Sequence, residues 1–356
     1  YTTLFRSAST YDASQALTAN TFTLTGYSFD GWAMTAGGNV VYTDGQSVRT
    51  LASTQDANVT LFAKWSPVLS YFWGEGNDGS YAHPYIINTT AGLDLLATLV
   101  NGGNDFSGKY FRLGANIEYD SDVVNNFTPI GEFINGNFNY FNGNFNGQGS
   151  DGTQYEISGI NINKPDDDDL YIGLFGATDE DASLDNIVLC NATITGQDFV
   201  GGIVGNNYGY LYNCRVFNTS VTAIQTVSGI ICANSYNEDW LNNNYYYNCS
   251  AKTGNNAAQT ANIGTGNRYD INGAKSIHKL SLGNYVNTST SPTLTYKGTD
   301  YYAVGTPITL SYSQTVPHGQ ILFFTVNGEV IDGETFNMPS NRADATAAAV
   351  LDINFA

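Results

Sequence analysis

The chain has 356 residues and a formal net charge of −19, with 13 Lys and Arg against 32 Asp and Glu. Phosphate binding needs a basic face, so this balance argues against nucleic acid and disfavours anionic membranes and polyanionic substrates. Charged residues make up only 13% of the chain, about half the usual share. Neutral polar side chains must therefore cover most of the surface, which is typical of an extracellular β protein. No apolar run is long enough to span a bilayer.

The first seven residues, 1–7, resemble the translation of a common sequencing adapter, so they are not expected to belong to the fold. We therefore expect a fragment of a gene whose secretion signal and surface anchor lie outside this chain. From residue 8 to residue 67, apolar and polar residues alternate between turn signals, which predicts strands and hairpins.

Two stretches of this first segment, 26–32 and 61–65, resemble the internalin B-repeat (the Listeria–Bacteroides repeat). The resemblance implies a small β-grasp-like module that serves as a spacer or in surface interactions. Trp32 and Trp65 are expected to close its very small core.

One helix is expected near the start of the second segment, residues 70–262. Thr89 or Thr90 can cap its N-terminus, its apolar face carries Leu93, Leu96 and Val100, and residues 101–103 end it. Elsewhere the sequence indicates short strands.

A repeat follows. Residues 173–176, Gly-Leu-Phe-Gly, recur as Gly-Ile-Val-Gly 29 residues later and as Gly229–Cys232 another 27 residues on. Short strands separated by Gly and Asn turns at a fixed period predict a solenoid. Asn at equivalent corners can stack into amide ladders, with Asn186/Asn213 and Asn191/Asn218 as candidates. The alternative is that Asn is simply the residue that tight turns favour.

This region resembles the GLUG-motif family of bacterial surface proteins, at Ile172–Gly176, Val200–Asn206, Gly209 and Asn213–Cys214. Three stretches upstream also fit the family, namely residues 128–131, 141–149 and 157–160. The resemblance implies a right-handed parallel β-helix that the helix near residue 95 caps. In the third repeat Cys232 takes the place of Gly205 and Trp240 that of Asn213, so we expect the solenoid to decay there.

The third segment, residues 270–356, follows a Gly/Asn/Ala-rich linker that lies between 254 and 274. Runs at 294–296, 308–310 and 321–326 predict strands, and Asn327-Gly328 predicts a hairpin turn. Residues 335–339 resemble the close of small β-sandwich repeats in Bacteroides surface proteins, which implies an immunoglobulin-like β-sandwich. The whole chain is therefore expected to be all-β and multidomain.

Catalytic motifs are absent from the sequence: there is no HExxH, Walker loop or nucleophile elbow, so no enzymatic activity is expected. The four cysteines have no CxxC spacing, and they are either small buried thiols or include a Cys214–Cys249 disulfide. Residues 166–169 are four consecutive Asp, followed by Glu180 and Asp181. They could bind calcium or form a solvated loop, and no cofactor is expected.

Aromatic residues gather in the later coils and form the candidate binding surface: Tyr208, Tyr210, Tyr212, Tyr236, Trp240 and Tyr245. Exposed aromatic faces can stack on sugar rings or anchor proteins. Alternatively, these rings pack against the third domain or cap the solenoid. Arg215 is the only arginine in the repeats and is expected to point outward.

These features predict a monomeric, non-enzymatic adhesin on the bacterial cell surface. Its rigid β-helix would present a face to a host surface protein or a neutral glycan. Two alternatives stay open: a polysaccharide-acting β-helix enzyme (a lyase or glycoside hydrolase), which a concave acidic cleft would favour, and a purely structural stalk.

Overall fold

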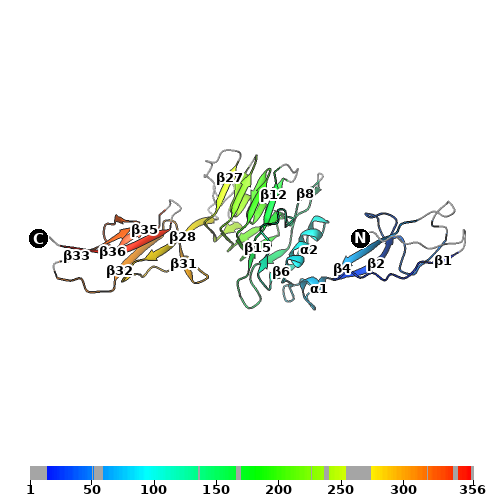
Figure 1. Cartoon of the computed structure of the whole chain (residues 1–356), viewed down its shortest axis with the longest axis horizontal. Coiled ribbons are helices and arrows are strands. Elements are labelled where there is room, and N and C mark those ends of the chain that lie inside the picture. The colour runs from blue at the N-terminus through cyan, green and yellow to red at the C-terminus, as the bar shows by residue number, and fades with distance from the viewer. Residues whose placement is uncertain are drawn as a thin grey trace. The chain divides into compact units, whose positions relative to one another are not determined.

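The computed structural model describes residues 14–49, 51, 59–134, 137–165, 170–225, 227–235, 240–253, 274–318, 320–339 and 344–353. The chain forms two compact units, residues 1–77 and 78–356. Strands dominate both units, and the described residues include two α-helices (Figure 1). The predicted all-β class is therefore confirmed. The adapter-like start of the chain and linker residues 254–273 lie outside the described residues.

The first unit contains two small antiparallel sheets. One pairs β1 (Gln15–Ala16) with β3 (Ser47–Val48), and the other pairs β2 (Tyr27–Ala33) with β4 (Phe62–Pro67). A short helix that the sequence analysis missed, α1 (Leu69–Trp73), follows β4.

The core of this unit is built around one tryptophan. Trp32 is buried together with Leu17 and Leu61. Trp65 is only partly buried and packs edge-on against Phe29, with ring centroids 5.3 Å apart. Of the two tryptophans expected to close the core, only Trp32 is fully buried. The β-grasp topology stays a prediction.

The expected helix is α2 (Thr90–Asn101), drawn in cyan in Figure 1. Thr89 caps it, because its hydroxyl accepts a hydrogen bond from the Gly92 amide at 3.2 Å. Asn101, at the other end, donates to the carbonyl of Pro129 and accepts from the amide of Gly131. These contacts bind α2 to the first coil of the solenoid, so the predicted helical cap is confirmed.

Parallel strands stack into five sheets that run along the solenoid, and we number them in the order in which a coil visits them. The first sheet contains β5 (Tyr85–Ile87), β6 (Tyr110–Leu113), β10 (Asn144–Asn146), β15 (Ser183–Asp185), β20 (Tyr210–Tyr212) and β25 (Leu241–Asn242). The second contains β7 (Ile117–Glu118), β11 (Glu156–Ser158), β16 (Val188–Cys190), β21 (Arg215–Phe217), β26 (Asn244–Tyr247) and β28 (Ala274–Leu282).

The other three sheets are shorter. The third contains β12 (Asn161–Lys164), β17 (Thr193–Gly196), β22 (Ser220–Ala223) and β27 (Ser250–Thr253). The fourth contains β13 (Tyr171–Ile172), β18 (Phe199–Gly201) and β23 (Val227–Gly229), and the fifth contains β14 (Phe175–Thr178), β19 (Val204–Asn207) and β24 (Cys232–Ser235). A hairpin of β8 (Phe133–Ile134) and β9 (Asn137–Phe138) interrupts the first coil.

The solenoid core is a stack of apolar side chains from equivalent positions in successive coils. In the first sheet the central residues are buried and lie one above the next, namely Phe111, Phe145, Leu184, Leu211 and Leu241. Their neighbours in the strands point outward because side chains alternate between the two faces of a strand. One coil alone could not bury this row, so the coils stabilise one another.

Asparagines in the left-handed conformation form the corners. Asn186, Asn213 and Asn243 turn the chain from the first sheet into the second, and Asn191, Asn218 and Asn248 turn it into the third, with φ between 50° and 57°. Asn adopts this conformation more readily than other L residues with a side chain.

The amide ladders form one coil later than expected. Asn243 donates to Asn213 Oδ1 at 2.6 Å, and Asn248 donates to Asn218 Oδ1 at 2.9 Å. Asn213 itself donates to Asp185 Oδ1 at 3.0 Å and not to Asn186. Stacked corner asparagines are therefore present, but the two predicted pairs are not the ones joined by their amides.

The expected decay of the third repeat is wrong. Strand register pairs Val204 with Cys232, so Ala233, and not Cys232, takes the position of Gly205. Tyr212 pairs with Asn242, which places Trp240 above Tyr210 and gives the corner of Asn213 to Asn243. The amide of Cys214 donates to the side chain of Asn244, 30 residues further on, so this coil is 30 residues long at the corner. A spacing of 27 residues therefore aligned residues that do not occupy equivalent positions.

The recurring glycines allow the fourth and fifth sheets to approach closely. A Cβ atom at Gly205 would lie 2.7 Å from the Ile172 amide nitrogen and 2.8 Å from the Gly176 carbonyl oxygen. A Cβ at Gly176 would overlap the Gly131 carbonyl. Gly176 and Gly205 thus have no room for a Cβ in this tight arch, whereas the next coil carries Ala233 at the equivalent position.

The cysteines are free thiols. Register places Cys214 opposite Asn244 and Cys249 opposite Thr219, at two different corners, so the alternative of a Cys214–Cys249 disulfide is wrong. Burial raises the pKa of the Cys214 thiol to about 12, as expected of a buried, unreactive thiol.

Strand β28 passes from the solenoid into the C-terminal domain. Its first residues pair with β26, its middle pairs with β31 (Thr299–Ala303), and its end pairs with β36 (Ala345–Ile353). The remaining strands are β29 (Val286–Thr288), β30 (Leu294–Tyr296), β32 (Pro307–Tyr312), β33 (Gln320–Val326), β34 (Glu329–Val330) and β35 (Thr335–Asn337).

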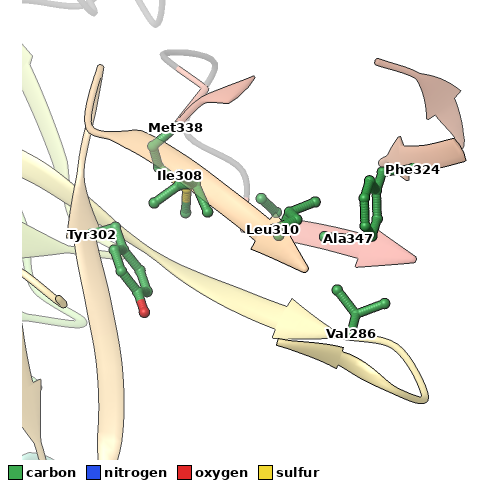
Figure 2. Close-up of a cluster of buried hydrophobic side chains, with 8 residues drawn as sticks. Val286, Tyr302, Ile308, Leu310, Phe324, Met338 and Ala347 are labelled. Atoms are coloured by element: carbon green, nitrogen blue, oxygen red, sulfur yellow. The ribbon is translucent and has the colours of Figure 1, made fainter. Parts of the chain in front are cut away.

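This domain is the expected β-sandwich. Strands β28, β36, β33 and β34 form one layer, and β29, β32 and β35 form the other. Side chains from both layers meet in a buried core around Ile308, Leu310 and Phe324 (Figure 2). Asn327 and Gly328, both at positive φ, form the predicted turn between β33 and β34.

Replacing a corner asparagine tests the role of the left-handed turns. We expect Asn218→Ala to lower the free energy of unfolding by about 1 kcal/mol more than Asn218→Gly, because Ala is strained at positive φ and Gly is not. Both variants lose the hydrogen bond from Asn248, so their difference isolates the strain. Urea unfolding followed by circular dichroism measures it, and equal losses would contradict this account.

Candidate functional site

Three of the predicted aromatic residues meet on the outer face of the first sheet. Tyr210 and Tyr212 lie on either side of the buried Leu211 in β20, so both point outward. The ring of Tyr210 lies 5.8 Å from that of Tyr212 and 5.2 Å from that of Trp240 in the next coil. Tyr210 is 37% exposed, and its two neighbours are partly exposed.

The other three predicted residues lie elsewhere. Tyr208 follows β19 and packs against Tyr140, with ring centroids 5.9 Å apart. Tyr245 belongs to the second sheet, and Tyr236 lies outside the described residues. The structure therefore does not bring the six aromatic residues into one surface.

Arg215 points outward, as expected, but it is partly buried and its guanidinium is held by the protein. It stacks over the ring of Tyr245 at 4.8 Å, and its Nη1 donates to the carbonyl oxygens of Cys214 and Asn243. Burial lowers the pKa of this guanidinium. Arg215 thus stabilises the corner at Asn243.

The C-terminal domain covers the second sheet. Tyr296 stacks on Phe217 with ring centroids 4.3 Å apart and 12° between the planes, and Tyr301 packs against Tyr247 at 5.0 Å. The hydroxyl of Tyr247 donates to Asp344 at 2.7 Å. The alternative that aromatic residues of the later coils pack against the third domain is therefore correct for Tyr247, and Phe217 makes a similar contact that was not predicted.

A polar cluster fixes the edge of this contact. Glu156 in β11 accepts hydrogen bonds from the hydroxyl of Tyr296 and, at 2.8 Å, from the ammonium of Lys297. The Sγ atom of Cys190 lies 3.6 Å from the same hydroxyl, and burial raises the pKa of this thiol to about 11. The domain thus contacts several successive coils, and this face of the solenoid is occupied.

The outer face of the first sheet carries two rows of side chains that cross the coils. Its residues form what we call the outer strip: Tyr110, Asn144, Ser183, Tyr210 and Trp240 in one row, and Arg112, Asn146, Asp185 and Tyr212 in the other. All are partly or fully exposed. Tyr81, which is 75% exposed, packs against Tyr110 with ring centroids 5.3 Å apart. Aromatic rings therefore lie at both ends of the strip and polar groups at its centre.

Sequence reasoning found only one end of this strip. The alternation of apolar and other residues is visible in each strand, for example in Asn-Phe-Asn at 144–146 and Ser-Leu-Asp at 183–185. The sequence does not show which of these strands pair with one another, because the coils differ in length.

A second aromatic row was also missed. Phe138 from the β8–β9 hairpin lies 5.6 Å from Tyr140 and 6.3 Å from Tyr171, which in turn lies 5.6 Å from Phe199. Phe138 is 49% exposed and the others are partly buried. This row lies beside the fourth sheet, whose strands carry Tyr171 and Phe199.

An acidic groove of about 490 Å³ lies between α2 and the first coil. Its lining includes Asp94, Thr98 and Glu132. Glu132 is only 4% exposed, and its Oε1 lies 3.7 Å from the ammonium of Lys164. Asp94 accepts a hydrogen bond from the hydroxyl of Tyr119 at 2.7 Å, and burial raises the pKa of this carboxyl above its ordinary value.

No metal site emerges from the described residues, in which no group of three or more His, Cys, Asp and Glu could hold an ion. The run of Asp at 166–169 lies outside them, so calcium binding there stays untested. Neither helix in the described part of the chain has the length and apolar character that crossing a membrane requires.

Two known proteins are similar to part of the chain. A protein of Evansella cellulosilytica named as a Gly-rich membrane protein is 34% identical over 147 residues, which cover 40% of this chain and 15% of that protein. Halomucin of Haloquadratum walsbyi is 30% identical over 160 residues, or 43% of this chain and 2% of that protein. The chain thus spans a small part of each relative.

No family model matches the chain, and no solved structure matches it significantly. The resemblances to the GLUG family, the internalin B-repeat and the Bacteroides β-sandwich repeat therefore stay predictions.

The raised pKa of Asp94 has a consequence for stability. When a carboxyl has a higher pKa in the folded than in the unfolded state, its ionisation lowers the free energy of unfolding of the protein as the pH rises through the folded pKa. Asn has the same shape, cannot ionise, and can still accept from Tyr119. We therefore expect Asp94→Asn to melt at a higher temperature than the parent at pH 7, and the two to converge as pH falls below 3.8, the ordinary pKa of this carboxyl.

Asp151 provides the control with the opposite sign, because hydrogen bonds from Thr153 lower the pKa of its carboxyl. Asp151→Asn is expected not to raise the melting temperature at pH 7. A gain from both substitutions would indicate a general effect of net charge and would contradict the assignment to Asp94.

Proposed function

We propose that this chain is part of an extracellular bacterial surface protein of the adhesin type, whose solenoid presents a rigid binding face. The observation that carries the proposal is the outer strip of the first sheet, where partly exposed aromatic rings and polar groups lie in register across successive coils. Such a face is fixed before any ligand arrives, because the stacked coils hold its strands in place. Little entropy is then lost on binding.

The two relatives support a surface location. One is named as a membrane protein and the other as halomucin, and both are much longer than this chain. Parallel coils that stack on one another also make an extended scaffold. The first unit and the C-terminal β-sandwich then act as spacers or additional contact modules, as the resemblances to surface repeats imply.

Binding to a broad array tests the proposal. The purified chain is applied to immobilised glycans, mucins and matrix proteins, and we expect saturable binding to at least one class. The melted protein serves as the control for nonspecific adsorption. Absence of saturable binding across the whole array would favour a purely structural stalk.

The acidic groove supports a second candidate, a polysaccharide hydrolase. Glycosidases use two carboxyl groups, one of which is a general acid with a raised pKa. Asp94 and Glu132 line one groove, and burial raises the pKa of Asp94. Asp94 then donates the proton to the leaving oxygen, and Glu132 acts as the base or nucleophile.

Release of reducing ends from neutral polysaccharides tests this candidate. If the groove is catalytic, Asp94→Asn and Glu132→Gln each lower the rate by at least ~100-fold. Thr128→Ser, at the rim of the same groove, is the matched control and keeps the activity. No product from any polysaccharide of a broad panel would exclude hydrolysis of those substrates.

A further inference from the structure

The geometry of the outer strip points to a particular class of ligand. We propose that the strip binds a linear, uncharged polysaccharide that lies across the coils, with its sugar rings stacked on Tyr81 and Tyr110 at one end and on Tyr210, Tyr212 and Trp240 at the other. This inference rests on the proposed function, and it specifies the class of ligand and the site at which the ligand binds.

The spacing of the strip suits an extended chain. The row from Tyr110 to Trp240 crosses four strand spacings, because the register runs from Tyr110 through Asn144, Ser183 and Tyr210 to Trp240. Neighbouring strands lie about 4.8 Å apart, so the aromatic ends are separated by about 14–19 Å. A short oligosaccharide segment spans that length, whereas a single sugar does not.

The centre of the strip offers hydrogen-bonding groups whose positions are already fixed. Asp185 accepts from Asn213 through Oδ1, which leaves Oδ2 as an acceptor. Asn146 accepts through Oδ1 from the Gln148 amide and from Asn186, which leaves its two N–H donors. Such preorganised donors and acceptors match the hydroxyl groups along a sugar chain.

The charge of the strip favours an uncharged ligand. It contains one carboxylate, Asp185, and one guanidinium, Arg112, whose Nη1 lies 3.4 Å from the carbonyl oxygens of Gln148 and Gly149. The chain as a whole carries a net charge of −19, which repels polyanions. An anionic polysaccharide is therefore the least suitable of the linear glycans.

The order of groups along the strip argues for a glycan over a protein partner. Protein interfaces place apolar groups at the centre and polar groups at the rim. The outer strip has the reverse arrangement, with Asn144, Ser183 and Asp185 between two aromatic ends. By contrast, the protein contact that this solenoid does make, at Phe217 and Tyr247, is aromatic at its centre.

Affinity measurements on strip variants test the inference. Isothermal titration with a soluble β-glucan, a mannan, a galactan and an α-glucan identifies the glycan that binds, and polygalacturonate is the anionic comparison. We expect Trp240→Ala and Tyr110→Ala each to weaken binding by on the order of tenfold, because each removes one stacking surface. Asp185→Asn should weaken it without changing the shape of the site.

Phe138→Ala is the matched control, since it removes an exposed ring from the second aromatic row and should leave the affinity unchanged. Affinity should also rise with oligosaccharide length until both ends of the strip are engaged. All the substituted side chains point outward, so we expect the melting temperatures of the variants to be unchanged. Measuring these temperatures checks that each variant folds.

The outcomes separate this inference from the proposed function. Glycan binding that survives every substitution in the outer strip, or that Phe138→Ala abolishes, would contradict the assignment of the glycan site to the strip. The proposed function would still stand. Binding to proteins alone, or a preference for polygalacturonate, would overturn the ligand class and leave the surface role intact. Absence of any binding on the broad array counts against the proposed function itself.

Discussion

The structure depends on the parallel register between coils, and the left-handed asparagine corners keep that register. Asn213 and Asn218 each turn the chain at one corner, and the amides of Asn243 and Asn248 in the next coil bond to them. These corners thereby begin their strands at the same level in successive coils. Coils of different length still stack, because the extra residues leave the corners in place.

Register also decides which surfaces can act. Side chains alternate along each strand, so a fixed corner places the same alternation in the same row of every coil. In the second sheet the outward row includes Phe217 and Tyr247, and the C-terminal domain covers it with Tyr296 and Tyr301. In the first sheet the outward rows are at least partly exposed. One scaffold thus holds a domain on one face and leaves a different face available for a ligand.

The candidate site could be predicted only in part. Tyr210, Tyr212 and Trp240 were found because aromatic residues crowd the late coils, but Asn144, Ser183 and Asp185 carried no signal of their own. These polar residues become part of one surface only when their strands pair. The acidic groove was equally hidden, because Asp94 and Glu132 come from a helix and an irregular segment of the first coil.

The sequence by itself determined the repeat, the helix and the class of fold. Left-handed turns favour Asn or Gly, the arch between the fourth and fifth sheets has no room for a Cβ at Gly176 and Gly205, and both preferences are local and visible in the chain. Only the tertiary structure decided the register of the last coil, the pairing of corner amides and the arrangement of the outer strip. These depend on contacts between residues about 30 positions apart, and no local pattern specifies how many residues each coil inserts.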